Sequence, residues 1–195
     1  MMGAVAIIPA RRGSRRIPHK NRAIFRGKPI IEYSIDTAKA TRLFDRIIVS
    51  TDDPDIADIA MNKGAWAIYR KDEYCQDHVG TQEVIAQCVQ LISAPLTCAI
   101  YPTAPLMLAG DLERGYRMLQ EQPERQFAMS VGTDPLQDAG QFYWGRTEAF
   151  IRRRELLAAH TIMIPIANNR VCDINTHEDW ERALKMYAAL HGGEE

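Results

Sequence analysis

Residues 4–21, AVAIIPARRGSRRIPHKN, hold the pattern that decides the fold of this 195-residue chain. Residues 4–8 form a continuous apolar run that Pro9 ends, which is typical of a strand buried on both faces of a parallel sheet. A basic loop follows at once, and residues 11–28 contain eight Lys or Arg and no Asp or Glu. A strand that leads into a basic loop with a glycine predicts an anion site at the carboxyl end of that strand.

The rest of the chain alternates between short apolar runs and amphipathic patterns of helical spacing. The apolar runs predict further strands at 46–51, 65–70, 96–101, 126–131, 140–145 and 160–166. The helical patterns predict helices at 29–41, 53–64, 81–92, 110–121 and 176–191. Two of these helices carry start signals, with Asp53 before Pro54 in one and Thr176 before Asp179 in the other.

This alternation predicts an α/β fold. Strands that alternate with helices form βαβ units, and right-handed crossovers place helices on both faces of a mostly parallel sheet, which gives three layers. Ligands of such sheets bind beyond the carboxyl ends of the strands. The expected site therefore lies among the loops at 9–22, 50–55, 69–81 and 101–106.

Composition excludes several classes of protein. The net charge is −1, with 46% hydrophobic and 25% charged residues, so a general nucleic-acid binder is not expected. No apolar run is long enough to span a bilayer, and residues 1–8 lack the basic start of a signal peptide. The four cysteines form no C-x-x-C pair, which favours free thiols in a reducing compartment. We therefore predict a cytoplasmic protein without a membrane partner.

The basic loop at 9–22 suits a nucleoside triphosphate. Gly13 lets backbone N–H groups approach a phosphate closely, and the arginines around it neutralise charge. The pattern is neither a P-loop nor a dinucleotide fingerprint. Two alternatives stay open at this point, a solvated basic loop and a local RNA-contact patch.

Two acidic segments are candidates for a metal or for sugar hydroxyls. STDDPD, residues 50–55, supplies Asp52, Asp53 and Asp55, although for Asp53 a helix N-cap is the favoured interpretation. VCDINT, residues 171–176, places Asp173 and Asn175 two positions apart, so both oxygens can reach one metal ion. A turn before the last helix is the structural alternative for this second segment.

Five segments together resemble one family. IIPARRGSRRIPHKN, FDRIIVSTDDPDIADIA, YPTAPL, DAGQFYWG and VCDINTHEDWERA occur in the order seen in the cytidylyltransferases that activate acidic sugars, such as CMP-sialic acid and CMP-Kdo synthetases. YPTAPL followed by DAGQFYWG is most similar to members that act on pseudaminic acid. The resemblance implies a three-layer α/β/α, Rossmann-like nucleotidyltransferase domain over residues 1–195. It also implies transfer of CMP from CTP to the anomeric hydroxyl of a nine-carbon acidic sugar, with release of pyrophosphate and dependence on Mg²⁺.

The resemblance also implies roles for individual residues. The catalytic group would be Arg11, Arg15, Lys20 and Asp173. The nucleotide would be bound by Arg11, Gly13, Ser14, Arg15, Lys20, Asn21, Arg70, Thr81 and Thr103. Tyr101, Asp138, Gly140 and Gln141 would meet the sugar, and Asp173 with Asn175 would hold Mg²⁺ near the α-phosphate.

The chain departs from the family pattern at three places. Arg15 stands where the family usually has Lys, which keeps the charge and changes its geometry. Asn175 stands where the family usually has Asp, and this loss of charge predicts weaker Mg²⁺ binding. Most of the family's central insertion is absent near residues 134–137, which weakens the family expectation of a homodimer.

Three rival hypotheses accompany the prediction of a pseudaminic acid cytidylyltransferase activity. The first keeps the reaction and changes the sugar to a neuraminic, legionaminic or Kdo-type acid. The second is a non-catalytic nucleotide-binding homologue, motivated by Asn175 and the short centre. The third is a polyanion-binding module that uses the basic loop, which predicts RNA affinity that falls steeply with salt.

Overall fold

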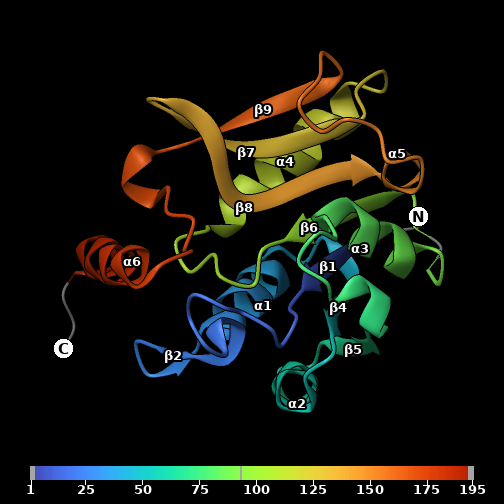
Figure 1. Cartoon of the computed structure of the whole chain (residues 1–195). Coiled ribbons are helices and arrows are strands. Elements are labelled where there is room, and N and C mark those ends of the chain that lie inside the picture. The colour runs from blue at the N-terminus through green and yellow to red at the C-terminus, as the bar shows by residue number, and fades with distance from the viewer. Residues whose placement is uncertain (1–2, 93, 193–195) are drawn as a thin grey trace.

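A seven-stranded sheet forms the middle layer of the computed structural model, which describes residues 3–92 and 94–192 (Figure 1). Its strand order is β5-β4-β1-β6-β8-β7-β9. The bounds are β1 Ala4–Pro9, β4 Phe44–Thr51, β5 Trp66–Tyr69, β6 Leu96–Ile100, β7 Phe127–Thr133, β8 Leu136–Arg146 and β9 Thr161–Ile166. Four neighbouring pairs are parallel, and β8 alone runs antiparallel to both of its neighbours. The predicted mostly parallel α/β sheet is confirmed.

The helices cover both faces of the sheet, as the three-layer prediction requires. On one face lie α1 (Ile30–Thr41), α2 (Pro54–Asn62) and α4 (Ala109–Glu121), and on the other lie α3 (Thr81–Val89) and α5 (Thr147–Ile151). Strand β1 shows why both faces need a cover. Ala6 and Ile8 pack into the core on the side of α1, α2 and α4, whereas Ile7 packs into the core on the side of α3 and α5. All three side chains are fully buried, so the continuous apolar run reflects burial on both faces.

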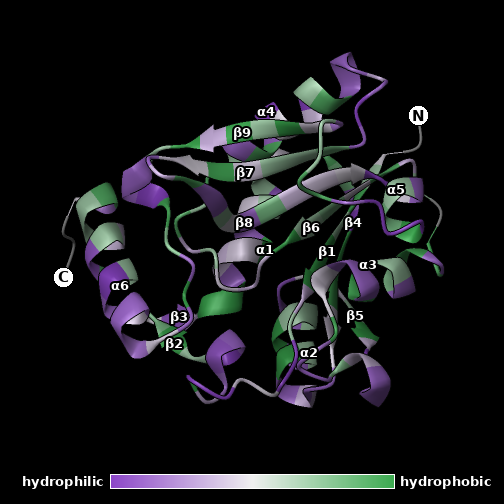
Figure 2. Ribbon diagram, turned by 45° about the horizontal axis from the view of Figure 1, so that its top comes forward, coloured by the Kyte–Doolittle hydropathy of each residue, from purple (hydrophilic) through white to green (hydrophobic). Residues whose placement is uncertain are grey.

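The C-terminal helix α6 (His177–His191) lies apart from the main sheet and has its own small core. Its Tyr187 ring packs edge-to-face on Phe25 of the short hairpin formed by β2 (Ile24–Phe25) and β3 (Lys28–Pro29), and on Tyr33 of α1. The Thr176 hydroxyl accepts a hydrogen bond from the Asp179 N–H at 3.2 Å, and the Asp179 carboxylate accepts one from the Thr176 N–H at 2.8 Å. The predicted capping box is therefore confirmed. In Figure 2 α6 alternates between hydrophobic and hydrophilic colouring, whereas β6 is mainly hydrophobic.

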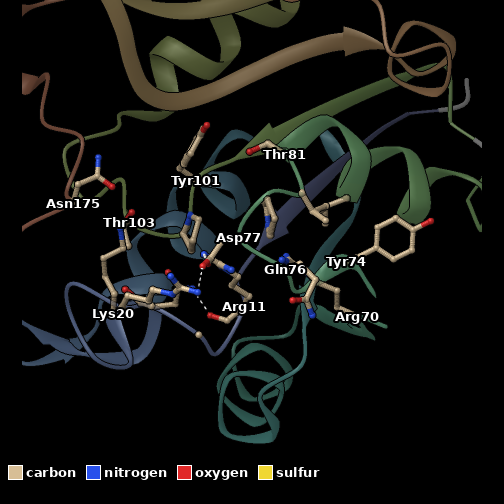
Figure 3. A pocket seen from close by; sticks show the side chains of 18 of the residues that line it. Arg11, Lys20, Arg70, Tyr74, Gln76, Asp77, Thr81, Tyr101, Thr103 and Asn175 are labelled. Atoms are coloured by element: carbon tan, nitrogen blue, oxygen red, sulfur yellow. Dashed lines mark hydrogen bonds and ion pairs between the residues drawn. The ribbon is translucent and has the colours of Figure 1, made fainter. Parts of the chain in front are cut away.

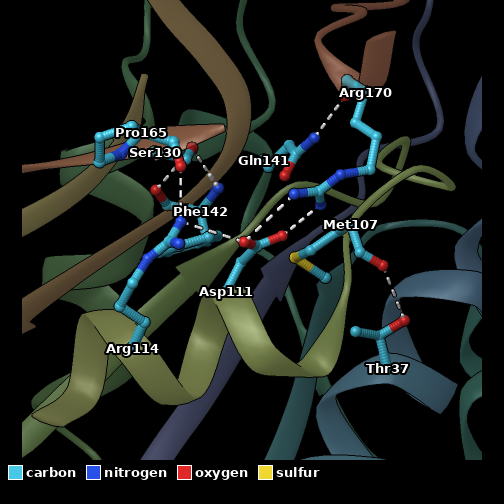
Figure 4. A network of polar contacts seen from close by, with 9 residues as sticks. All are labelled: Thr37, Met107, Asp111, Arg114, Ser130, Gln141, Phe142, Pro165 and Arg170. Atoms are coloured by element: carbon cyan, nitrogen blue, oxygen red, sulfur yellow. Dashed lines mark hydrogen bonds and ion pairs between the residues drawn. The ribbon is translucent and has the colours of Figure 1, made fainter. Parts of the chain in front are cut away.

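A buried ion-pair network ties α4 to the segment after β9 (Figure 4). Asp111 is 5% exposed and accepts hydrogen bonds from Arg170, which belongs to the 3-10 helix η3 (Asn168–Arg170), and from Arg114 at 3.1 Å. The Arg170 carbonyl accepts a hydrogen bond from the Gln141 amide at 2.7 Å. The network therefore fixes the start of the segment that leads to Asp173.

Two predicted elements differ in length from those of the structure, and several short elements were not predicted. Helix α3 ends at Val89 rather than at residue 92, and β8 begins at Leu136 rather than at residue 140. The earlier start of β8 follows from pairing, because Thr133 of β7 faces Leu136 across a tight hairpin at residues 134–135. The sequence did not predict α5, β2, β3 or the 3-10 helices η1 (Lys20–Arg22) and η2 (Asp72–Tyr74), which are too short to show a period. No helix in residues 3–92 and 94–192 is long and apolar enough to cross a membrane.

Candidate active site

A cavity of about 570 Å³ opens at one edge of the sheet, beyond the carboxyl ends of β1 and β6 (Figure 3). The antiparallel β8 reaches this same edge with its amino-terminal half. Phe142 pairs with Ile100 at the end of β6, and the Tyr101 N–H donates to the Gln141 carbonyl at 2.9 Å. The edge is the place that the parallel strand order favours for ligands.

Acidic residues after β4 hold the basic loop in place. The Arg12 N–H donates to the Asp52 carboxylate at 2.7 Å, and Arg22 pairs with Asp53 and Asp55 at 3.4 and 3.2 Å. Asp53 also caps α2 through the Asp55 N–H at 3.0 Å, as predicted. The contacts of STDDPD thus serve to position the loop.

The same loop is closed on itself by an amide. The Asn21 side chain, which is 7% exposed, donates to the Arg11 carbonyl at 2.8 Å. This contact joins the two ends of the loop, and both residues line the cavity. The Arg11 side chain also donates to the Cys75 carbonyl at 2.9 Å, so the loop after β5 borders the same cavity.

A carboxylate in the cavity wall holds two arginines of the basic loop. Asp77 pairs with Arg11 at 2.7 Å and with Arg15 at 2.5 Å, one oxygen to each guanidinium (Figure 3). The hydrogen bond from Arg11 and the charge of Arg15 lower the pKa of the Asp77 carboxyl, against its partial burial. Two arginines on one carboxylate reproduce the chemistry by which arginines bind a phosphate group.

We expect the Asp77→Asn variant to bind inorganic triphosphate roughly fivefold more tightly than the unmodified chain. A phosphate group that binds Arg11 and Arg15 would have to replace Asp77 there, and exposed pairs of this kind are worth about 0.2–1 kcal/mol each. Titration calorimetry with inorganic triphosphate would measure the change. Asp72→Asn is the matched control, because Asp72 lies in the same loop and its carboxylate accepts from the Tyr69 hydroxyl at 3.2 Å rather than from an arginine of the basic loop. Weaker binding by Asp77→Asn would contradict this account.

Lys20 joins the basic loop to the C-terminal segment. Its ammonium lines the cavity and donates to the Ile174 carbonyl. Burial lowers the pKa of this ammonium below its ordinary 10.5, and the negative charge of Asp173 opposes the shift. Asn175 continues the contact: its amide donates to the Asp173 carboxylate at 2.6 Å, and its oxygen accepts from Arg16 at 3.0 Å. Positively charged side chains and polar oxygens therefore alternate where the basic loop meets the C-terminal segment.

Gly140 lies against Asp173. Its φ of +63° is a conformation that side chains rarely adopt, and a Cβ there would stand 3.1 Å from the Asp173 Cβ. Glycine thus allows β8 to approach the Asp173 segment closely. Two residues earlier, the exposed Asp138 carboxylate accepts from the Tyr143 hydroxyl, which lies 3.1 Å from the hydroxyl of Tyr101. Polar side-chain contacts therefore connect Asp138 through Tyr143 to Tyr101 in the cavity wall.

Arg70 lies deepest among the cations. Only 3% of it is exposed, and its guanidinium donates to the carbonyl and the hydroxyl of Ser50 at 2.9 and 3.3 Å. Burial lowers the pKa of Arg70 from its ordinary value. Arg70 therefore fixes the floor of the cavity at the ends of β4 and β5.

The structure brings most of the predicted site residues together. Those that line the cavity are Arg11, Gly13, Ser14, Arg15, Lys20, Asn21, Arg70, Thr81, Tyr101, Thr103 and Asn175. Asp138, Gly140 and Asp173 lie next to this set through the contacts described above. Gln141 is not brought to the cavity: it is 2% exposed and its amide turns to the Arg170 carbonyl.

Sequence reasoning missed Asp77, Arg16 and Tyr143. Arg16 stands in the basic loop itself, so its position was a usable signal. Asp77 lies in the loop at 69–81 that the sequence marks for the site, but no local pattern predicts its pairing with arginines more than 60 positions away. Tyr143 lies among aromatic residues that also suit packing.

The family model described as cytidylyltransferase matches residues 5–168. This chain belongs to the cytidylyltransferase family. The match spans both the basic loop and β8, and it confirms the family resemblance of the sequence. Residues 171–175, which contact the loop through Lys20, lie beyond the matched region of this cytidylyltransferase.

Known proteins are similar to this chain over most of its length. The pseudaminic acid cytidylyltransferase of Campylobacter jejuni is 30% identical over 228 aligned residues, which cover 97% of this chain and 98% of the relative. The N-acylneuraminate cytidylyltransferase of Escherichia coli O18:K1:H7 is 29% identical over 128 residues, covering 65% of this chain and 30% of the relative. A CMP:2-keto-3-deoxy-manno-octonic acid synthetase solved in complex with CTP superposes with a TM-score of 0.80 at 17% identity, covering 96% of this chain and 99% of that one. This last likeness establishes a shared fold.

Proposed function

We propose that the chain transfers CMP from CTP to the anomeric hydroxyl of an acidic sugar, with pseudaminic acid as the favoured nine-carbon substrate. The observation that carries the proposal is the cavity of about 570 Å³ in which Arg11, Arg15 and Lys20 converge at the carboxyl ends of the strands. The family match and the similarity to the C. jejuni relative support the choice of nucleotide and sugar.

In the proposed reaction the anomeric oxygen attacks the α-phosphorus, the bond to the bridging oxygen breaks, and pyrophosphate leaves. The hydroxyl proton is released to water. Phosphoryl chemistry of this kind depends mainly on positioning and on charge stabilisation. Arg11 and Arg15 would release Asp77 and bind the β- and γ-phosphates, and Lys20 would neutralise charge at the transferred group. Thr103 and Tyr101 would border the junction between nucleotide and sugar.

The residues around Asp173 fit a divalent cation that is held partly by phosphate. Asp173 has an exposed carboxylate that accepts from the Asn175 side-chain nitrogen at 2.6 Å, and the oxygen of the same Asn175 amide, which accepts from Arg16, is a second potential ligand. Within residues 3–92 and 94–192 no three His, Cys, Asp or Glu side chains gather to hold a metal. Mg²⁺ commonly uses one or two protein carboxylates together with substrate phosphates and water. When bound there, Mg²⁺ would offset negative charge on the phosphates.

We expect the Asn175→Asp variant to reach half-maximal rate at a three- to tenfold lower Mg²⁺ concentration. A second carboxylate beside Asp173 adds a charged ligand, and ligand charge sets the affinity of such sites. The measurement is the rate against Mg²⁺ concentration, together with Mn²⁺ binding followed by electron paramagnetic resonance. An unchanged Mg²⁺ dependence would count against a metal at these residues.

Pyrophosphate release from CTP across a panel of nine-carbon and eight-carbon sugar acids tests the proposed function. Release with pseudaminic acid alone would identify both reaction and sugar. Release with a neuraminic, legionaminic or Kdo-type acid would keep the reaction and change the substrate. CTP binding without release for any sugar, from folded protein, would favour a non-catalytic nucleotide-binding protein.

We further propose that residues 1–195 act as one domain in the cytoplasm. Sedimentation would test whether the short β7–β8 hairpin is compatible with a homodimer.

A further inference from the structure

A second cavity of about 440 Å³ adjoins the first. The two share Thr81 and Tyr101 in their walls, so a ligand in one can reach the other. Tyr143 and Leu156 supply a hydroxyl and an apolar surface to the second cavity. This mixture suits a sugar, which presents hydroxyl groups and carbon-bound hydrogens at once.

Arg153 is the one cationic side chain among the described residues that line the second cavity. It follows α5, where its N–H donates to the Phe150 carbonyl at 3.0 Å. Its φ is +49°, a left-handed conformation in which glycine is the least costly residue.

The only charged contact that the structure gives Arg153 within residues 3–92 and 94–192 is to Glu83, at 3.2 Å. The Arg153 side chain is 57% exposed, and an exposed pair of this kind stabilises the protein little, so its guanidinium is available to a ligand. Glu83 is held independently, because its other oxygen accepts from the Gly80 N–H at 3.0 Å. Glu83 belongs to the same first turn of α3 as Thr81, so Arg153 lies close to the wall that the cavities share.

We propose that Arg153 binds the carboxylate of the acidic sugar and thereby selects acids over neutral sugars. The inference rests on the proposed function and adds a specificity residue to it. In a 2-keto sugar acid the carboxylate is bonded to the anomeric carbon, so the cation that binds it must lie near the junction of the nucleotide and sugar cavities. The guanidinium presents two parallel donors that match a carboxylate. Arg11, Arg15 and Lys20 of the first cavity are assigned to the phosphates in the proposed function.

The test compares Arg153→Gln with Arg152→Gln. Arg152 is the matched control, because it is 61% exposed and, directly after α5, pairs with Glu148 of that helix rather than lining the cavity. Steady-state rates are measured with the sugar acid identified in the panel and with its C1 carboxamide, and CTP affinity is measured by calorimetry. For Arg153→Gln we expect the KM for the acid to rise roughly 10- to 100-fold, since a charge-assisted hydrogen bond is lost. The preference for acid over carboxamide should fall by a similar factor, while the Kd for CTP changes less than twofold.

Arg153→Lys keeps the charge and should recover part of the preference for the acid. The thermal midpoint of each variant verifies that the fold is retained. An acid preference that survives in Arg153→Gln, with the unmodified chain active, overturns the assignment of Arg153 and leaves the proposed function intact. An unmodified chain that binds CTP and reacts with no sugar acid overturns the proposed function and the Arg153 assignment together.

Discussion

We expect the Lys20→Met variant to lose about 10²–10³-fold in kcat/KM for the transfer of CMP, since removal of one donor aimed at developing charge has an effect of that order. Lys20 lines the cavity between the basic loop and Asp173, and its ammonium already donates to the Ile174 carbonyl. Methionine keeps much of the length and removes the charge. Pyrophosphate release under single-turnover conditions would separate the loss in chemistry from a loss in binding.

The pH profile gives this prediction a second readout. Burial lowers the pKa of Lys20 below 10.5, and the ammonium is charged only below its pKa. The unmodified chain should therefore lose activity on the alkaline side at a lower pH than an ordinary lysine would cause, and Lys20→Met should lack this limb. Lys28→Met is the control, because Lys28 pairs with Asp36 at 2.6 Å outside the cavity. A loss in kcat/KM of less than fivefold for Lys20→Met would exclude Lys20 from the reaction.

The Asp111→Ala variant should lower the free energy of unfolding by about 3–5 kcal/mol, because removal of one partner leaves a buried charge uncompensated. Arg170 is only 12% exposed at its side chain and has Asp111 as its ion-pair partner in the part of the chain that the structure describes. Urea unfolding followed by circular dichroism would measure the change, on the assumption of a two-state transition.

Glu113→Ala is the matched control on the same helix. Glu113 is exposed, and surface substitutions of this kind usually change stability by less than about 0.5 kcal/mol. If Asp111→Ala cost less than about 1 kcal/mol, the Asp111–Arg170 pair would not hold η3 in place. The position of Asp173 would then depend on other contacts.

Local signals explain why much of the fold could be predicted from the sequence. The apolar run of β1, the Asp53 cap and the Thr176–Asp179 capping box each depend on residues within a few positions. Strand direction has no such signal, since an apolar run reads alike in both directions, and the antiparallel course of β8 was not predicted. Its reversal is what brings Gly140 to Asp173.

In the candidate site too, features that depend on neighbouring residues could be predicted from the sequence, and features that depend on tertiary contacts could not. The basic loop is one continuous segment, so an anion site could be predicted there from the residues, and the family resemblance implied the roles of Arg11, Arg15 and Lys20 in it. The pairing of Asp77 with Arg11 and the inward turn of Gln141 depend on tertiary contacts between distant segments. Arg153 lacked a signal because a run of three arginines after a short helix reads as a solvated surface.

The contact between Lys20 and Ile174 joins residues 154 positions apart. The central sheet is complete once β9 ends at Ile166, so every strand can pair before the Asp173 segment is in place. During synthesis on the ribosome, the chain can therefore form its sheet while the nucleotide cavity still lacks one wall. The cavity would gain this wall only as α6 docks on the aromatic cluster around Phe25.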